Sequence, residues 1–286
     1  MILVTGATGK TGGATLQALT KLGAPVRALV RDPNKWHVPE GVEVAVGHFE
    51  DPASLDAALQ GVEKAYLVGA STEQQVEQES AFVAAARRAG VRHLVRLSVI
   101  GADQPGVGAM RFAAYHQILE RVVRESGLPW TFLRPNGFMQ NYLGQAQSLA
   151  QQGVFYSSLS PAAKVSHIDA LDIGAVAAKT LTEPGHEGQA YTLTGPEPLS
   201  DDDIAARFST VLGRPIKHIQ VPLAGTRETM LANGFPAWNV DGLAELWALY
   251  ETGAAAGVAP DVERLLGHPA RSFEDFVRDH LTTFGG

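Results

Sequence analysis

The sequence contains no cysteine. Disulfide bonds, zinc sites built on thiolates, iron–sulfur clusters and cysteine nucleophiles are therefore all excluded. Of the 286 residues, 45% are hydrophobic, so the chain can bury a sizeable core without such cross-links. Its length suits one large α/β domain, or a ligand-binding domain with a small second lobe.

Basic tracts and long apolar runs are also missing. The formal net charge of −7 argues against nucleic-acid binding, because proteins that bind nucleic acid neutralise phosphates with Lys and Arg. No apolar run approaches the roughly 20 residues that span a membrane, and no charge block favours a membrane surface. The N-terminus starts at once as a strand, without a signal-peptide pattern, so we expect a cytoplasmic location.

Short β-branched runs alternate with segments rich in Ala and Leu through the first half of the chain. The segments between these runs are predicted helices, of which three stop at Gly23, Gly90 and Gly127. Strands separated by helices pair in parallel, since a parallel crossover needs about a dozen residues. We therefore predict an α/β fold, a Rossmann-type doubly wound parallel sheet with its ligand at the carboxyl ends of the strands. The predicted strands are Ile2–Thr5, Val26–Val30, Val42–Val46, Lys64–Val68, His93–Ser98 and Trp130–Leu133.

The second half has a different rhythm. Residues 153–161 are rich in turn formers, and the GAAAG segment at 253–257 is expected to be a flexible joint. Ser200 and Ser272 are each followed three residues later by an aspartate, which is typical of a helix start. We predict a Rossmann domain over residues 1–155, with its sheet completed by segments near 165–195. A smaller, mostly helical C-terminal lobe over residues 156–286 is expected to cover the cleft.

The most informative motif is GATGKTGG at residues 6–13, directly after the first strand and at the start of the first helix. Glycine allows a tight turn and a close approach of the backbone to a pyrophosphate, which then meets the free N–H groups of the helix start. In this strand–turn–helix context the motif predicts a dinucleotide site. The end of a Walker A loop also reads Gly-Lys-Thr, but Val4 stands where that loop needs its first glycine.

The end of the second strand indicates which dinucleotide binds. An acid at this position binds the ribose 2′-hydroxyl of NAD, whereas an arginine accommodates the 2′-phosphate of NADP. Arg31 takes the strand-end position, and Lys35 adds a second positive charge nearby. The prediction is therefore NADP(H). If the strand runs one residue further, Asp32 becomes the acid and NAD is favoured.

Several stretches together resemble the NmrA-like atypical short-chain dehydrogenase/reductases. They include VTGATGKTGG, ALVRDPNK, AARRAGVRHLVRLSVIGAD, SGLPWTFLRPNGFMQN and the tail GVAPDVERLLGHPARSFEDFV, so the resemblance covers nearly the whole chain. That family includes NADPH-dependent quinone reductases, triphenylmethane-dye reductases and regulators that bind the dinucleotide without known turnover.

The resemblance implies a set of cofactor residues that follow the strand ends. His48 departs from many relatives, which carry an aspartate there, but neutral imidazole can accept the same hydrogen bond from adenine. The residues from Thr8 to Gly12, namely Thr8, Gly9, Lys10, Thr11 and Gly12, would hold the pyrophosphate, and Gly6 is a further cofactor-binding residue of the same turn. The 2′-phosphate would lie on Arg31 and Lys35, the adenine on His48 and Phe49, the adenosine on Gly69, Ala70 and Ser71, and the nicotinamide half near Ser98, Val99, His116, Pro135, Asn136 and Phe138.

The Tyr-x-x-x-Lys pair that most short-chain dehydrogenases use for acid–base chemistry has no match here. Ser98 occupies the expected serine position, but the helix positions read from His116 to Glu120, and Tyr115 is followed four residues on by Leu119. His116 and Glu120 share a helical face and could form a hydrogen-bonded pair. His116 is thus either a proton donor or ribose contact, or simply a structural group. A metal site is disfavoured because no third ligand lies nearby.

Phe138, Met139 and Tyr142 fall at helical spacing. They are expected either to line an apolar substrate pocket or to be plain core. The expected function is an NADPH-dependent reductase that transfers hydride to a conjugated small-molecule acceptor such as a quinone or dye. The alternative is a redox sensor that binds NADP(H) without turnover. Neither the acceptor nor the oligomeric state follows from the sequence.

Overall fold

The computed structural model describes residues 1–104 and 110–286, and its chain divides into two compact units. The first unit comprises Met1–Pro135 and Ala170–Leu193, and the second comprises Asn136–Asp169 and Thr194–Gly286. Compared with the division expected from the sequence, residues 136–155 group with the second unit. Residues 170–193, which lie in the stretch near 165–195 expected to complete the sheet, belong to the first unit.

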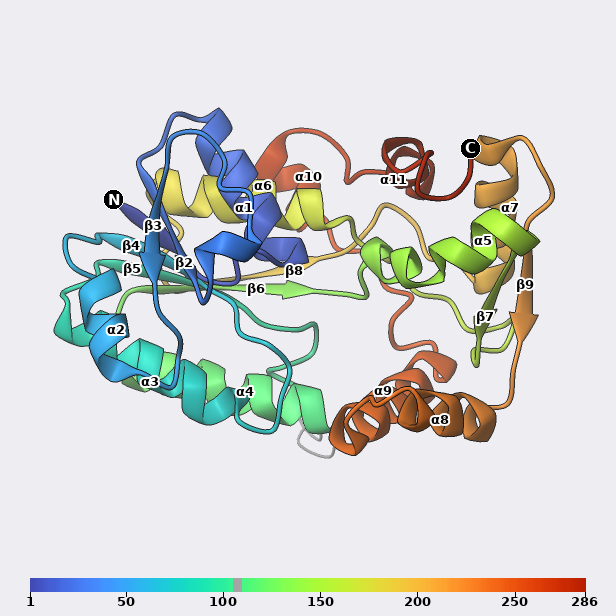
Figure 1. Ribbon diagram of the computed structural model, residues 1–286, viewed down its shortest axis with the longest axis horizontal. Helices are drawn as coiled ribbons and strands as arrows, with labels where there is room; N and C mark the ends of the chain where they lie inside the picture. Colours follow the sequence, from blue (N-terminus) through green and yellow to red (C-terminus); the bar gives the residue numbers. More distant parts are fainter. Residues whose placement is uncertain (105–109) are drawn as a thin grey trace. The chain divides into compact units, whose positions relative to one another are not determined.

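Seven parallel strands form the sheet of the first unit, in the order β3-β2-β1-β4-β5-β6-β8 (Figure 1). Helices α1 and α6 cover one side of the sheet, whereas α2, α3 and α4 cover the other (Figure 1). This is the doubly wound α/β fold that the sequence predicts. The strands are β1 (Ile2–Val4), β2 (Val26–Val30), β3 (Val42–Val46), β4 (Lys64–Leu67), β5 (His93–Leu97), β6 (Trp130–Pro135) and β8 (Gln189–Leu193). The helices are α1 (Lys10–Lys21), the 3-10 helix η1 (Pro33–Lys35), α2 (Pro52–Ala58), α3 (Gln75–Arg88), α4 (Arg111–Glu125) and α6 (Ala170–Thr182).

The central strands are buried over nearly their whole length because helices cover both faces of the sheet. Leu3, Ala65, Leu94 and Phe132, from four adjacent strands, belong to one apolar cluster and expose no surface. Strands β1 to β5 agree with the predicted ranges to within one residue. β6 is two residues longer than predicted and ends at Pro135.

The strand order reverses between β1 and β4, which is where open α/β sheets bind ligands. Thr5, just past β1, fastens the two strands together at this point. Its hydroxyl oxygen accepts a hydrogen bond of 2.8 Å from the N–H of Val68 and lies 3.0 Å from the Val68 carbonyl oxygen. The loops that follow β1 and β4 therefore leave the sheet from a fixed edge.

Helix α6 packs against α1 with almost no space between their backbones. A Cβ atom on Gly174 would overlap the backbone carbonyl carbon of Ala14. Such an approach is possible only because both residues are small. The stretch that returns from the second half of the chain is thus built into the first unit.

The second unit combines helices with a two-stranded parallel sheet, β7 and β9. β7 lies inside the stretch that the sequence analysis assigns to turns, so that assignment was wrong for these four residues. The elements are the 3-10 helix η3 (Met139–Gln145), α5 (Ala146–Gln152), β7 (Val154–Ser157), α7 (Asp201–Leu212), β9 (Lys217–Gln220), α8 (Leu223–Ala232), α9 (Ala237–Glu251), α10 (Asp261–Leu266) and α11 (Phe273–Asp279).

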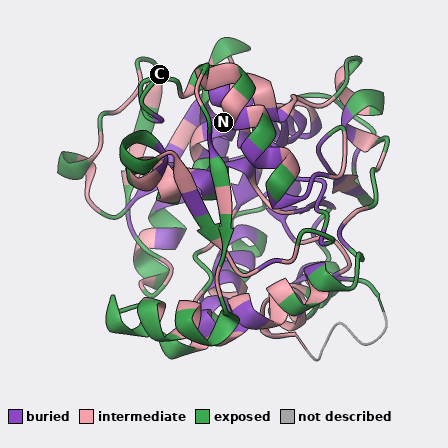
Figure 2. Cartoon of the chain, turned by 90° about the vertical axis from the view of Figure 1, so that its right-hand side faces the viewer, coloured by how far each residue is buried: buried purple, intermediate pink, exposed green. Residues whose placement is uncertain are grey.

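Burial is uneven across the second unit (Figure 2). No residue of α8 is buried, whereas Phe208, Phe276 and Phe284 expose no surface and form an aromatic core with their neighbours. Met139 and Tyr142 belong to this core, and the Tyr142 hydroxyl donates a hydrogen bond of 2.7 Å to Asp201. Of the two interpretations left open by the sequence, plain core is correct for these two residues.

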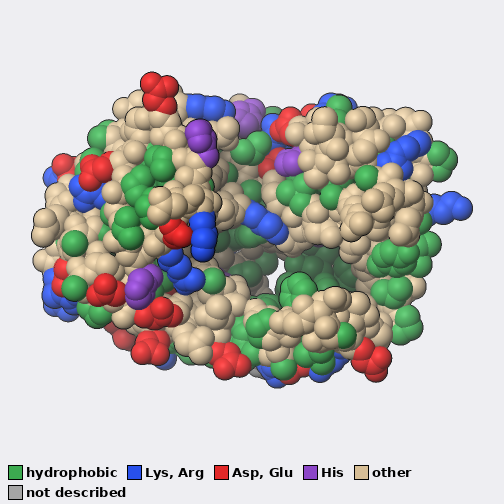
Figure 3. Space-filling model, viewed as in Figure 1, with side chains coloured by type: hydrophobic (Ala, Val, Ile, Leu, Met, Phe, Trp, Pro, Cys, Tyr) green, Lys and Arg blue, Asp and Glu red, His purple; other side chains and the backbone are tan. Residues whose placement is uncertain are grey.

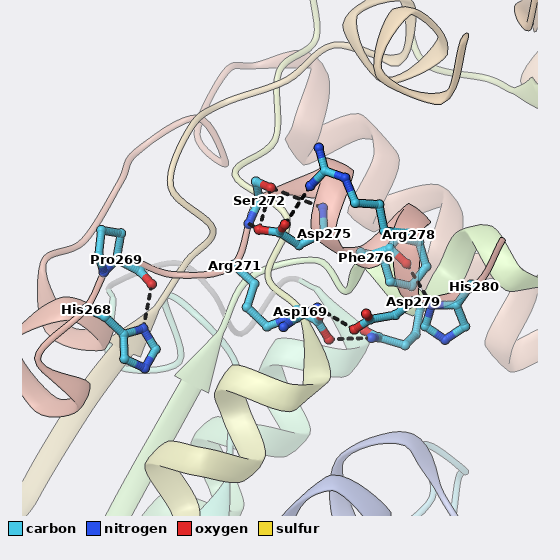
Figure 4. Close-up of polar contacts among 11 residues, drawn as sticks. Asp169, His268, Pro269, Arg271, Ser272, Asp275, Phe276, Arg278, Asp279 and His280 are labelled. Atoms are coloured by element: carbon cyan, nitrogen blue, oxygen red, sulfur yellow. Dashed lines mark hydrogen bonds and ion pairs between the residues drawn. The ribbon is translucent and has the colours of Figure 1, made fainter. Parts of the chain in front are cut away.

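Ion pairs and helix caps fix the C-terminal segment of the second unit (Figure 4). Arg271 donates to the buried carboxylate of Asp169 at 2.8 Å and also pairs with Asp279. Ser272 caps α11 through a reciprocal pair of hydrogen bonds with Asp275. The predicted helix start at Ser272 is therefore confirmed, and Ser200 forms the same capping box at α7.

The GAAAG segment is not the free joint that its composition suggests. Ala255 is buried, and its carbonyl oxygen accepts hydrogen bonds from the backbone N–H of Ser166 and from the Asn136 side chain. These bonds tie the segment to the rest of the second unit. Within the described ranges, none of the helices is long and apolar enough to cross a membrane.

Candidate functional site

The glycine turn after β1 is shaped so that only small residues fit. Gly6 has a φ of +59°, which other residues rarely adopt, and its carbonyl oxygen accepts a hydrogen bond of 2.8 Å from the N–H of Gly9. A Cβ atom on Gly12 would collide with that same carbonyl oxygen. Helix α1 begins immediately after Gly9, and no side chain caps its first turn.

The residues predicted to hold a pyrophosphate divide by exposure. Thr8, Gly9 and Lys10 are exposed at the start of α1, whereas Thr11 and Gly12 are buried. The first three can meet an anion directly. The buried pair shapes the turn instead, and the Thr11 carbonyl accepts a hydrogen bond from the Thr15 hydroxyl inside the helix.

β2 ends at Val30, so Arg31 is the first residue beyond the strand, and it is exposed. Asp32 caps the short η1 helix, since its carboxylate accepts a hydrogen bond of 3.0 Å from the backbone N–H of Asn34. Lys35 lies at the end of η1, with its ammonium 3.5 Å from the other Asp32 oxygen. The strand is not one residue longer, and the carboxylate that would favour NAD has a structural task.

The loops after β3 and β4 carry the residues predicted for the adenosine half. His48 is exposed and lies 3.5 Å from Glu50, whereas the Phe49 ring packs edge-on against Phe82 with centroids 5.8 Å apart. Ala70 and Ser71 are exposed. A Cβ atom on the adjacent Gly69 would lie 2.8 Å from a carboxylate oxygen of Glu79, so this loop runs close over α3.

Ser98 is committed to a buried carboxylate. Its hydroxyl donates a hydrogen bond of 2.7 Å to Glu120 of α4, and both side chains are almost fully buried. Arg134 of β6 donates to both oxygens of the same carboxylate, at 2.9 and 2.7 Å, and Arg124 donates to one. Burial alone would raise the pKa of Glu120, but the hydrogen bonds from Arg134 and Ser98 outweigh it and lower that pKa.

His116 does not form the predicted hydrogen bond with Glu120. Its Nδ1 lies 3.2 Å from the Nη2 of Arg96, a side chain of β5 that exposes no surface. Arg96 also donates a hydrogen bond of 2.8 Å to the buried carboxylate of Glu79 in α3. Burial and the neighbouring Arg96 charge hold the pKa of His116 well below its ordinary value. His116 and Glu120 therefore belong to two separate clusters, the first with Arg96 and the second with Arg124 and Arg134.

The residues predicted beyond β5 and β6 differ in their surroundings. Val99 is partly exposed after β5, and Pro135 is buried as the last residue of β6. Asn136 is also buried, and its amide donates to Ser166 at 2.9 Å and to the carbonyl of Ala255 at 2.8 Å. Its side chain thus has a structural role inside the second unit.

The backbone after Asn136 is fixed to a second segment of the same unit. Phe138 is partly exposed, and a parallel β-bridge joins it to Ile168. Phe138 therefore remains a candidate contact for the nicotinamide half. The amide oxygen of Asn136 accepts a hydrogen bond of 2.9 Å from the N–H of Gly137, and a contact of Asn136 with the cofactor stays a prediction.

Helix α4, on which the acid–base pair of the common dehydrogenases is expected, can be described residue by residue. α4 contains no lysine, and Tyr115 is followed one turn later by the buried Leu119. In residues 1–104 and 110–286, no group of three or more His, Asp and Glu side chains is placed to hold a metal ion.

The sequence did not point to four residues of these clusters, namely Glu79, Arg96, Arg124 and Arg134. A signal was present, because an arginine inside an apolar strand needs a buried carboxylate partner. The sequence could not identify that partner, since the choice depends on how α3 and α4 lie over the strands.

Comparison with known proteins gives consistent matches over the full length. The model of the NmrA-like family matches residues 1–275. The chain is 41% identical to the NAD(P)H azoreductase of Xenophilus azovorans, with 100% of this chain and 99% of that protein covered. It is 40% identical to the (4-alkanoyl-5-oxo-2,5-dihydrofuran-3-yl)methyl phosphate reductase of Streptomyces griseus, with 99% of both chains covered.

A solved structure extends this likeness to three dimensions. It is the NADPH-dependent quinone oxidoreductase of Escherichia coli in complex with NADPH, with a TM-score of 0.85 and 30% sequence identity. The match covers 99% of this chain and 100% of that one.

Proposed function

The chain belongs to the NmrA-like family, and we propose that it is an NADPH-dependent reductase that transfers hydride to a conjugated acceptor such as a quinone or dye. The observation that carries this proposal is the turn at Gly6 to Gly12, in which the backbone leaves no space for a Cβ at Gly12. Such a turn suits the close approach of a pyrophosphate to the start of α1.

The choice of NADPH over NADH rests on the residues after β2. Arg31 is exposed at the strand end, and Lys35 follows on η1. Asp32 lies beyond the strand end and caps η1 with one of its oxygens, which favours Arg31 over Asp32 as the residue that meets the ribose. The remaining predicted contacts, from His48 and Phe49 to Gly69, Ala70 and Ser71, all follow strands β3 and β4 of the same sheet.

The class of acceptor is drawn from the relatives. Their names describe reduction of an azo compound, a quinone and an unsaturated oxo-dihydrofuran. These three share an electron-poor conjugated system, which accepts hydride at carbon or nitrogen and spreads the resulting negative charge. We therefore propose a small, conjugated acceptor for this chain as well.

When bound, NADPH supplies the hydride, and a quinone becomes a hydroquinone after one proton is added from solvent. The protein then needs to bind the dinucleotide and the acceptor, hold them in the right orientation and limit the access of water. It does not need to supply a strong acid. His116, held neutral by burial and by the neighbouring Arg96, fits this description. We expect His116→Ala to lower kcat for a quinone by less than about tenfold, compared with roughly 10²–10⁴-fold for a lost general acid.

The proposal is tested by following the absorbance of NADPH at about 340 nm with purified protein and a panel of quinones and azo dyes. We expect NADPH oxidation that saturates with acceptor and is faster than with NADH. The matched control is Arg31→Ala, which should weaken the preference for NADPH without abolishing turnover. Tight NADPH binding with no oxidation by any acceptor would favour the alternative, a redox sensor without turnover.

The proposed partner is a small molecule rather than nucleic acid. On the face shown in Figure 3, acidic and basic side chains are interspersed, and the net charge of the chain is −7. Both features disfavour binding to a phosphate backbone. A cytoplasmic location remains a prediction.

A further inference from the structure

A buried chain of polar side chains runs from α3 through β5 to α4. The Gln75 amide donates a hydrogen bond of 2.9 Å to one oxygen of Glu79, and Arg96 donates one of 2.8 Å to the other oxygen. The Nη2 of Arg96 lies 3.2 Å from Nδ1 of His116. Gln75, Glu79 and Arg96 are each at most 2% exposed, whereas His116 is only partly buried.

This chain determines where the proton of the His116 ring lies. A guanidinium group has five N–H donors and no acceptor, so the hydrogen bond requires Nδ1 of His116 to be the acceptor. The single proton of the neutral ring must then be on Nε2. The carboxylate of Glu79 fixes the orientation of Arg96, and thereby the tautomer of His116.

The opposite edge of the ring is left as a hydrogen-bond donor. Nδ1 faces the buried guanidinium, so Nε2 is the ring nitrogen that can meet a ligand. The nearest acid on the same helix is Glu120, and its two oxygens already accept four hydrogen bonds, from Ser98, Arg124 and Arg134. A carboxylate oxygen with two donors has little capacity for a third, so Glu120 does not compete for the Nε2 proton.

We propose that Glu79 and Arg96 are positioning residues that hold His116 as a neutral Nε2–H donor, and that this donor binds an oxygen in the nicotinamide half of the dinucleotide. The inference rests on the proposed function for the identity of the ligand. His116 thus has a fixed binding role. Glu79 and Arg96 orient its ring in addition to stabilising the fold. A ring locked in this way binds its ligand oxygen without transferring a proton.

The first test is the tautomer itself, measured by long-range ¹H–¹⁵N correlation of the histidine rings in the wild-type protein, with His116→Gln used for assignment. We expect a protonated Nε2 and an unprotonated Nδ1 from about pH 5.5 to pH 8, and a shift of the Nε2 proton on addition of NADPH. A proton on Nδ1, or titration near pH 6.5, would overturn the positioning role. The expected tautomer without a shift at saturating NADPH would overturn the ligand assignment.

The second test removes the positioning pair without leaving a buried charge. The double variant Glu79→Gln with Arg96→Gln removes both charges of the buried pair, so neither is left without its partner in the interior. We expect the pKa of His116 to rise toward its ordinary value, because the Arg96 charge is gone while burial remains. The affinity for NADPH at pH 8 should fall roughly three- to tenfold, as for the loss of one hydrogen bond. His116→Leu should lose as much affinity, and His116→Gln, which keeps an N–H near the Nε2 position, should lose less.

The matched control is the exposed ion pair of Glu63 and Arg92. Arg92 directly precedes β5, the strand that carries Arg96. Its neutral double variant, Glu63→Gln with Arg92→Gln, should leave both the His116 tautomer and the affinity unchanged. An equal loss of affinity in both double variants would show that the effect is structural and contradict the inference. Failure of the wild-type protein to bind NADPH would contradict the proposed function instead, while leaving the tautomer measurement valid.

Discussion

The carboxylate of Asp32 accepts a hydrogen bond of 3.0 Å from the backbone N–H of Asn34. The side chain that could have recognised the ribose of NAD is thus the cap of a short helix, and Arg31 stands alone at the end of β2. Two residues that are adjacent in the sequence thus have different roles: Asp32 caps a helix, and Arg31 is placed to meet the ribose phosphate.

We expect NADPH to bind at least about tenfold more tightly than NADH, a difference of about 1.4 kcal/mol. Arg31→Ala should remove most of this difference and leave the affinity for NADH nearly unchanged, because only the 2′-phosphate loses its partner. Calorimetric titration of the wild type and the variant with NADPH and NADH measures the two affinities. Equal affinities in the wild-type protein would show that Asp32 determines the choice.

Gly12→Ala should damage both stability and dinucleotide binding, because the new methyl group would collide with the carbonyl oxygen of Gly6. We expect a loss of about 1–3 kcal/mol in the free energy of unfolding, the usual cost of overpacking, and a large loss in NADPH affinity. Gly225→Ala is the control, since a Cβ there meets nothing within 4 Å on exposed α8. An alanine at position 12 that binds NADPH normally would disprove the proposed role of the turn.

Ser98→Ala is expected to affect stability more than turnover. The hydroxyl is a donor to buried Glu120, so its removal should cost about 1.5–3 kcal/mol, the range for a hydrogen bond to a charged group. Denaturant unfolding measures this loss, with the exposed Thr210→Ala on α7 as a reference that should change little. A fall in kcat of about a hundredfold with stability intact would instead make Ser98 a catalytic residue.

His93 should make the protein less stable in mild acid. Burial, partly offset by Glu187, lowers the pKa of His93 to about 4, and its Nε2 lies 2.8 Å from the Thr131 hydroxyl oxygen. That hydroxyl donates to the carbonyl of His186, so His93 must be the donor. The unfolded chain binds a proton below about pH 6.5, whereas the folded chain does so only below about 4. The free energy of unfolding therefore falls as the pH drops through this window.

Between pH 7 and pH 5 this residue should account for about 2 kcal/mol of the loss. His93→Gln keeps an N–H donor for Thr131 but cannot titrate, so its unfolding free energy should fall by about 2 kcal/mol less over the same range. Urea unfolding at the two pH values gives the comparison. An unchanged pH dependence in the variant would place the proton-linked group elsewhere, with buried His167 the next candidate.

The sequence allowed the sheet and the glycine turn to be predicted because both depend on local patterns. β-branched runs mark buried strands, and a tight turn needs glycine wherever it occurs. β7 could not be predicted, because Val154–Ser157 is short, lies among turn formers and is a strand only through its pairing with distant β9. The hydrogen-bond partners of Ser98, His116 and Asn136 were likewise beyond prediction, since each depends on the packing of segments far apart in the sequence.

The close fit of α6 against α1 has a consequence for how this protein is made. Gly174 and the edge strand β8 lie some 40 to 60 residues past the end of β6, yet both belong to the first unit. A nascent chain that has emerged only as far as β6 therefore exposes the apolar side of α1 and the unpaired edge of β6, a combination that favours aggregation. The N-terminal unit can complete its fold only after Leu193 has left the ribosome, and a fragment ending near residue 155 would lack both elements that protect it.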